Sequence, residues 1–108
     1  MSVNAYIVTE TDVKIIDDKK YVYEKEEFLY NLWSKQEVTK ALLCGFADDY
    51  TNDDWIGEIC ISIDGWDNFK EEYLIDKKLN KLVNENKEIF QKIDEVMKNK
   101  YEVILKCK

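Results

Sequence analysis

The sequence predicts an α+β fold: a mainly antiparallel sheet of about five strands, with one short helix and a long C-terminal helical stretch packed on one face. Short β-prone segments separated by polar turns occupy the first part of the chain, residues 68–98 carry apolar residues at helical spacing, and an alternating segment follows them. The 108 residues, 45% of them hydrophobic, suit a single domain over 1–108 with its own core.

The first elements are strands. Residues 3–9 are apolar and β-prone. Residues 13–16 and 21–23 are similar and flank the polar sequence Asp17-Asp18-Lys19-Lys20, which predicts a hairpin. Because this turn contains no glycine, the sequence leaves the turn type open.

The short helix is predicted over 26–33. Phe28, Leu29, Leu32 and Trp33 recur at helical spacing within this segment. Its first turn is acidic, which favours the positive end of the helix dipole. The segment therefore has both the periodicity and the charge placement of a helix.

Residues 38–46 have two interpretations. Ser34 and Glu37 have the spacing of a capping box, which would start a further helix here. The continuous apolar run at 41–46, however, suits a strand buried on both faces. We favour the strand, with the helix as the alternative.

The clearest strand is predicted over 56–64. Ile59, Ile61 and Ile63 alternate with small or polar residues, so they would share one face of a sheet. The dipeptide Asp64-Gly65 then ends the strand. If 38–46 is also a strand, the segment between the two is a loop joining core strands.

The helical stretch is predicted to begin near Asn68, since Glu71 follows at the spacing of a capping box. Apolar residues then continue at helical spacing to about residue 98. Asn84-Glu85-Asn86 could divide the stretch into two helices, because Asn favours caps over helix interiors. Alternation over 101–107 predicts a closing strand.

The composition excludes much catalytic machinery. The chain contains no His and no Arg, and all sixteen positive charges are lysines. Without His, the commonest general base and zinc ligand are missing, and without Arg there is no planar fork for phosphate or guanine. No phosphate-binding glycine pattern is present. We therefore expect no enzyme, no catalytic residue, no metal site and no cofactor.

Charge and cysteine content indicate the class of partner and the compartment. Residues 1–76 contain 18 acidic residues and 7 lysines, a net of −11, whereas 77–108 carry a net of +4. Such an acidic region attracts basic proteins and repels nucleic acid. The odd number of cysteines, three, indicates reduced thiols. With no signal-peptide pattern and no long apolar run, we expect a cytoplasmic protein without a membrane partner.

Residues 46–55 are the predicted binding site, because they combine aromatic anchors with a dense negative charge. The predicted contact residues are Asp48, Asp49, Tyr50, Asp53, Asp54 and Trp55. The sequence thus predicts a small acidic inhibitor or immunity-type protein that blocks a basic partner, such as a nuclease toxin or a nucleic-acid-binding protein. Alternatively, its carboxylates could imitate a nucleic-acid backbone and occupy a DNA-binding cleft.

Two other functions stay open. The same aspartates could serve a divalent-metal-binding regulator or a metal-dependent enzyme, although the segment lacks the central glycine of the usual calcium loop. Alternatively, the chain could be a non-catalytic subunit of a larger assembly, with 68–98 as its interface. The sequence does not determine the oligomeric state.

Overall fold

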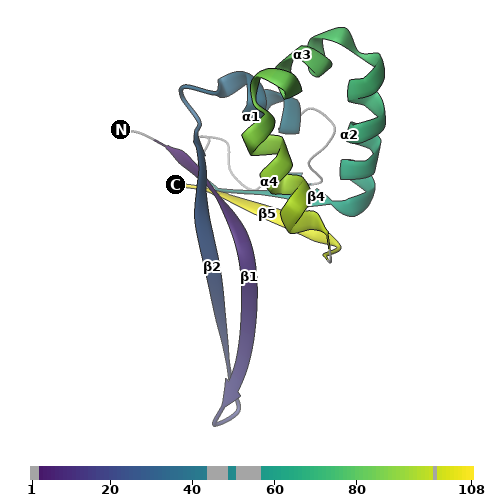
Figure 1. Cartoon of the computed structure of the whole chain (residues 1–108). Coiled ribbons are helices and arrows are strands. Elements are labelled where there is room, and N and C mark those ends of the chain that lie inside the picture. The colour runs from purple at the N-terminus through teal and green to yellow at the C-terminus, as the bar shows by residue number, and fades with distance from the viewer. Residues whose placement is uncertain (1–2, 44–48, 51–56, 99) are drawn as a thin grey trace.

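One antiparallel sheet organises the residues that the computed structural model describes, which are 3–43, 49–50, 57–98 and 100–108. Its strand order is β2-β1-β5-β4-β3. The strands are β1 (Asn4–Ile16), β2 (Lys19–Asn31), β3 (Asp49–Tyr50), β4 (Gly57–Ser62) and β5 (Glu102–Cys107). The helices are α1 (Gln36–Leu43), α2 (Ile63–Ile75), α3 (Lys77–Glu85) and α4 (Lys87–Met97). This arrangement (Figure 1) confirms the predicted α+β class and the antiparallel sheet.

The predicted N-terminal hairpin is confirmed, and it is longer than the sequence indicated. β1 and β2 pair from Asn4 opposite Asn31 to Ile16 opposite Lys19. The loop between them is Asp17-Asp18, and both residues have positive φ, at 51° and 62°. Positive φ at both central residues is the signature of a type I′ turn, whose twist matches that of the flanking strands. Asp tolerates this conformation better than most residues with a Cβ atom.

The predicted helix over 26–33 is wrong, because β2 continues to Asn31. β1 pairs with most of this segment up to Asn31, and Tyr30 and Leu32 alternate into the core. The hydroxyl of Tyr30 also lies 2.8 Å from that of Thr39 inside the protein. Aromatic and aliphatic residues favour strands as well as amphipathic helices, so the neighbouring strand overrides the local helical spacing.

The preferred strand over 38–46 is also wrong where the structure describes it, because α1 occupies Gln36–Leu43. Val38 and Leu42 lie one helical turn apart and are both buried, as is Thr39. The run is apolar because one stripe of a short helix packs on the core, not because two faces of a strand are covered. The capping-box spacing indicated this alternative.

The predicted strand over 56–64 is confirmed as β4, but it ends earlier. Ile59 and Ile61 are fully buried, as the alternation predicted. Ile63 instead begins α2, because the hydroxyl of Ser62 accepts a hydrogen bond from the backbone N–H of Gly65 at 3.0 Å. This cap starts the helix well before the predicted start near residue 68.

The long helical stretch is divided at two positions. The carboxylate of Asp76 accepts hydrogen bonds from the N–H groups of Lys78 and Leu79, so it caps α3 directly after α2 has ended. Asn86 separates α3 from α4, inside the segment where the sequence indicated a division. None of the helices in the described part of the chain is long and apolar enough to cross a bilayer.

The core lies between the helices and one face of the sheet. The rings of Trp66, Phe69 and Phe90 form an aromatic stack. The ring centroid of Phe69 lies 5.0 Å from that of Trp66 and 5.3 Å from that of Phe90. Buried residues from all four long strands complete this core, including Val103 and Leu105 of β5. The closing strand predicted from alternation is thereby confirmed.

The hydrogen bond between Trp66 and Asp94 should contribute measurably to stability. The buried indole Nε1 donates to Asp94 Oδ1 at 2.9 Å, and this bond, with that from Lys70, lowers the pKa of the carboxyl group. Asp94→Ala leaves the indole N–H unpaired, so we expect the free energy of unfolding to fall by about 1–3 kcal/mol. Urea titration measures this loss. Asp94→Asn keeps a hydrogen-bond acceptor, so its free energy of unfolding should fall less than that of Asp94→Ala. Equal stability of the Ala variant and the wild type would contradict this.

Candidate protein-interaction surface

The structure places two of the six predicted contact residues. Asp49 and Tyr50 form β3, which pairs antiparallel with Cys60 and Ile59 of β4 at one end of the sheet. The other four lie outside the described residues: Asp48, Asp53, Asp54 and Trp55. The segment does not join two core strands, since α1 precedes it. Part of it is itself an outer strand of the sheet.

A second surface, which the sequence did not single out, is the outer part of the β1–β2 hairpin. We call residues 10–25 the arm. β5 pairs with β1 over Ala5–Ile7, so within the described residues the arm is a ribbon of two strands. It projects away from the rest of the molecule (Figure 1). A two-stranded ribbon alone is at best marginally stable in water, so this part of the chain gains from being covered.

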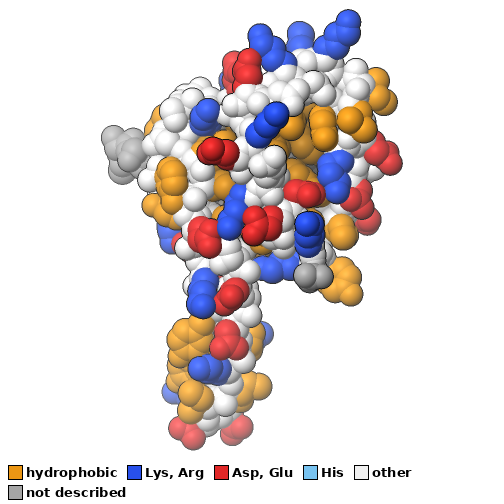
Figure 2. Space-filling view, viewed as in Figure 1, with side chains coloured by type: hydrophobic (Ala, Val, Ile, Leu, Met, Phe, Trp, Pro, Cys, Tyr) orange, Lys and Arg blue, Asp and Glu red, His pale blue; other side chains and the backbone are white. Residues whose placement is uncertain are grey.

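The arm exposes apolar side chains on both of its faces. Directly paired residues share a face, so Val13 lies beside Val22, and Ile15 lies two residues further along. We call these three the aliphatic face; the exposed fraction of Ile15 is 74%. The other side, the tyrosine face, contains the exposed residues Ile16, Tyr21 and Tyr23. Figure 2 shows hydrophobic side chains along the projection.

The two faces differ in chemistry. On the tyrosine face, the Nζ of Lys14 lies 5.6 Å from the ring centroid of Tyr23, a cation–π distance. Tyrosine rings also carry hydroxyl groups that water can hydrate. The aliphatic face consists of β-branched hydrocarbon side chains. It is therefore the face that gains more from leaving water.

The arm is nearly neutral although the chain is acidic. Residues 10–25 contain five acidic residues and four lysines, a net of −1. The rest of the chain then carries −6 of the formal net charge of −7. Charges of both signs alternate around the apolar side chains of the arm, so neither a strongly basic nor a strongly acidic partner is favoured by charge alone.

The molecule exposes more surface than a compact monomer of its size. Its accessible surface is 7351 Å² for a mass of 12.9 kDa, against about 6,300 Å² expected for a compact monomer. Its radius of gyration is 14.7 Å, against about 13 Å expected. The excess of roughly 1,000 Å² is similar to the ~800 Å² per partner that a stable protein interface buries.

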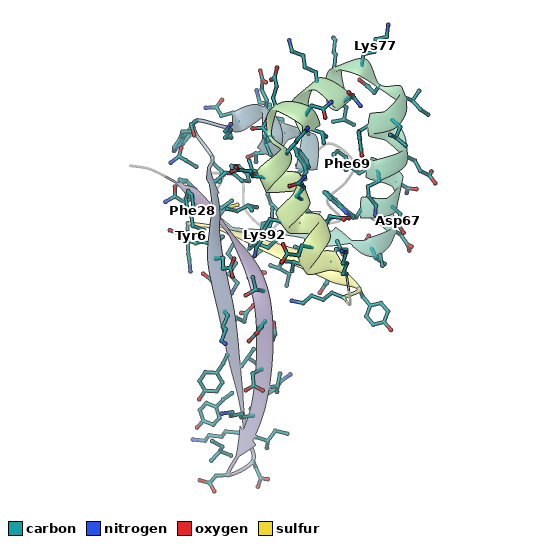
Figure 3. The ribbon with its side chains drawn as sticks, in the orientation of Figure 1. Tyr6, Phe28, Asp67, Phe69, Lys77 and Lys92 are labelled. Carbon is teal, nitrogen blue, oxygen red and sulfur yellow. The ribbon has the colours of Figure 1, made fainter. Side chains whose placement is uncertain are left out.

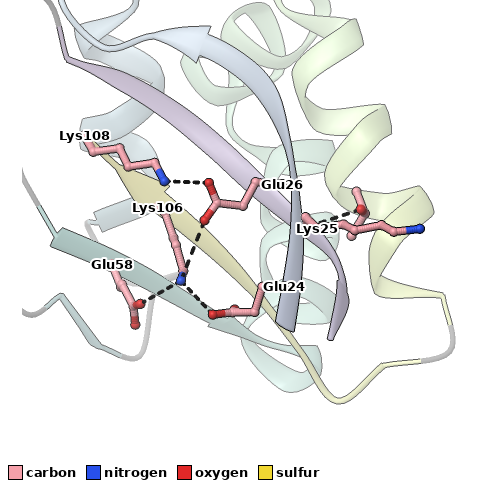
Figure 4. A network of polar contacts seen from close by, with 7 residues as sticks. Glu24, Lys25, Glu26, Glu58, Lys106 and Lys108 are labelled. Carbon is pink, nitrogen blue, oxygen red and sulfur yellow. Dashed lines mark hydrogen bonds and ion pairs between the residues drawn. The ribbon is translucent and has the colours of Figure 1, made fainter. Parts of the chain in front are cut away.

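A charged network fixes the root of the arm to the sheet (Figure 4). Lys106 of β5 donates a 2.7 Å hydrogen bond to Glu24 and lies 3.7 Å from both Glu26 and Glu58. The bond to Glu24 is the main cause of a raised Lys106 pKa. A 2.7 Å bond from Lys108 is the main cause of a lowered Glu26 pKa. The network joins β2, β5 and β4, so it holds the arm in one direction.

An aromatic contact and a shift in the strand register also hold the root of the arm in place. Tyr6 and Phe28 lie side by side across the two strands (Figure 3), with ring centroids 6.1 Å apart. The pairing register then shifts between Val8 and Glu10, and Lys100 donates a 2.7 Å hydrogen bond to the carbonyl of Thr9 at this shift. Bulges of this kind bend and twist a strand pair. The arm therefore leaves the sheet from a fixed point.

Among the described residues, no group of three or more Cys, Asp and Glu side chains is placed to hold a metal ion. Cys107 is a free thiol, and burial raises its pKa to about 11. A thiol that stays protonated at neutral pH is a poor nucleophile.

No protein-family model, curated protein or solved structure matches this chain.

The charged network should make stability depend on pH on the acidic side. Because the pKa of Glu26 is lowered from 4.5 in the folded protein, its stabilising contribution is present above that value and is lost as the pH falls through the folded pKa. Glu26→Gln removes this contribution. We expect the wild type to exceed the variant in urea midpoint near neutral pH, with the difference shrinking below pH 4.5. A pH-independent difference would contradict this. Glu10→Gln, which disrupts an exposed ion pair, is the control.

The type I′ turn should become more stable with glycine at its second position. Asp18→Gly removes the cost of a left-handed conformation for a residue with a Cβ atom. We therefore expect the free energy of opening the arm to rise by about 0.5–1 kcal/mol. Amide hydrogen exchange across residues 10–25 measures this directly. Asp12→Gly, inside β1, should instead speed exchange. Unchanged exchange in the Asp18 variant would contradict the turn assignment.

Proposed function

We propose that this chain acts by binding another protein and that the arm is its main contact. The observation that carries the proposal is the exposure of six apolar side chains on a ribbon two strands thick, Val13, Ile15, Ile16, Tyr21, Val22 and Tyr23. Contiguous exposed apolar surface marks interaction sites in soluble proteins. The fixed root supports this function, because a contact surface held in one direction loses less entropy on binding.

The charge of the arm favours a protein over a nucleic acid as the partner. Binding to a phosphate backbone requires an excess of positive charge, and the arm has a net of −1. Charges of both signs at the rim of an apolar patch are typical of protein interfaces. The expected partner surface is apolar at its centre, with lysines and carboxylates around it.

The acidic inhibitor or immunity-type function is the second candidate. It is favoured by the position of β3, which lies at the opposite end of the strand order from β2. This end of the sheet is therefore remote from the edge that continues into the arm. Asp49 and Tyr50 are in this strand, and the chain outside the arm carries a net of −6. A basic partner, such as a nuclease toxin, would use this end of the sheet, while the arm stays available for a different contact.

Site-specific photo-crosslinking in the expressing cell distinguishes the two candidates. A photoreactive residue at Ile15 reports on the arm, one at Tyr50 reports on β3, and one at Leu74, an exposed apolar position on α2, is the control. We expect Ile15 to give one adduct of defined mass that Val13→Thr/Val22→Thr abolishes, because those changes remove the neighbouring hydrocarbon surface.

The outcomes separate clearly. An adduct at Tyr50 with none at Ile15 would transfer the function to the acidic end of the sheet. The absence of any adduct at Ile15, or adducts of equal yield at Leu74, would refute the arm as the principal contact. Loss of the adduct in the double variant, with an unchanged circular dichroism spectrum, would show that the aliphatic face carries the contact.

A further inference from the structure

We infer that the partner of the arm is a second copy of this chain, and that two arms pack through their aliphatic faces across a two-fold axis. The inference rests on the proposed function, since it names the protein that covers the arm. A two-fold contact needs a surface that is complementary to itself. The area, charge pattern and symmetry of the arm each meet this requirement.

The exposed surface is of the size that a dimer contact buries. The chain exposes roughly 1,000 Å² more than a compact monomer of the same mass, and a standard interface buries ~800 Å² per partner. In a symmetric dimer both partners contribute the same patch, and the aliphatic face of the arm is part of this exposed surface. Because the arm carries only −1 of the net charge, two arms can approach without the repulsion that two acidic bodies would suffer.

The centre of the arm is the place for the axis. The pair Val13–Val22 lies four residues from the turn residues Asp17-Asp18, and Thr9 at the root lies four residues before Val13. A two-fold axis that runs beside this pair, parallel to the aliphatic face and perpendicular to the strands, therefore places the acidic tip of each arm over the root of the other. Lys106 lies at that root beside Glu24, on the side of the aliphatic face, so each acidic tip comes to lie near a lysine of the other copy.

The same axis matches the residues on either side of the centre. Ile15 of one copy comes to lie over Thr11 of the other, which presents a methyl group, and Lys20 comes to lie over Glu24. Each of these pairs occurs twice because of the symmetry. Glu24 already accepts a hydrogen bond from Lys106, and a carboxylate has acceptor capacity for a second cation.

Packing through faces is favoured over pairing of strand edges. In the described residues both strands of the arm have an open edge, and they carry Lys14 on β1 and Lys19, Lys20 and Lys25 on β2. Charged side chains, lysine above all, protect an edge from pairing with another strand. The apolar side chains of the arm lie on its faces, so face-to-face contact buries them while the lysines stay hydrated.

Sedimentation velocity of the full chain tests the dimer. We expect the wild type to have twice the mass of a 12.9 kDa chain, and Val13→Thr/Ile15→Thr/Val22→Thr to dissociate roughly a hundredfold more readily. Thr is also β-branched, so the hairpin is retained. Tyr21→Thr/Tyr23→Thr and Leu74→Gln/Ile75→Gln remove comparable exposed apolar surface elsewhere and should stay dimeric.

A disulfide test reports on the symmetry itself. A residue beside a two-fold axis faces its own copy, so Val13→Cys should form a disulfide-linked dimer under mild oxidation. Tyr21→Cys lies on the other face and should not. Cross-linking of equal yield at both positions, or at neither, would overturn the arrangement.

The failures of the two proposals can be told apart. A wild type that sediments as a single chain, or a dimer that persists in the triple Thr variant, overturns the second copy as the partner. If the photoreactive residue at Ile15 then gives an adduct with a different protein, the arm is still a binding surface and the proposed function holds. An Ile15 adduct of twice the chain mass supports both.

Discussion

The structure depends on β1, which pairs with two strands in the body of the protein and with one strand in the arm. Over Ala5–Ile7 the strand is central, with β2 on one side and β5 on the other, and its alternate residues enter the core. Beyond the register shift between Val8 and Glu10, β1 is paired with β2 in a ribbon without a third strand in the described residues. One strand therefore belongs both to the body and to the arm. The direction of the exposed surface follows from the packing of the core.

This division separates charge from apolar surface. Most of the net negative charge lies outside the arm, whereas the arm combines alternating charges with exposed aliphatic and aromatic side chains. A molecule arranged in this way can present an apolar contact without bringing two acidic bodies together. Two lysines have a further role, because Lys106 of β5 and Lys108, which follows that strand, neutralise glutamates of β2 and β4 on the sheet face at the root.

The candidate surface shows how far the sequence could be interpreted. Aspartates and aromatics at 46–55 directed attention to that segment because composition is visible locally, and β3 places part of it at the end of the sheet. The sequence pattern does not distinguish the arm, because Val13, Ile15 and Val22 are ordinary strand residues of the kind that usually lie in a core. Apolar residues on both faces of one hairpin were the available signal, since a hairpin with one solvated face alternates apolar and polar residues.

Signals that are local in the sequence predicted the N-terminal hairpin, β4 with Ile59 and Ile61 inward, the division of the helical stretch near Asn86, and the alternation of β5. Contacts between distant segments make 26–31 extend a strand and make α1 a helix, because an apolar segment adopts the form that its neighbours can cover. The tertiary structure also decided which apolar residues stay exposed. Burial depends on what lies across the sheet, and in the arm the described residues place nothing there.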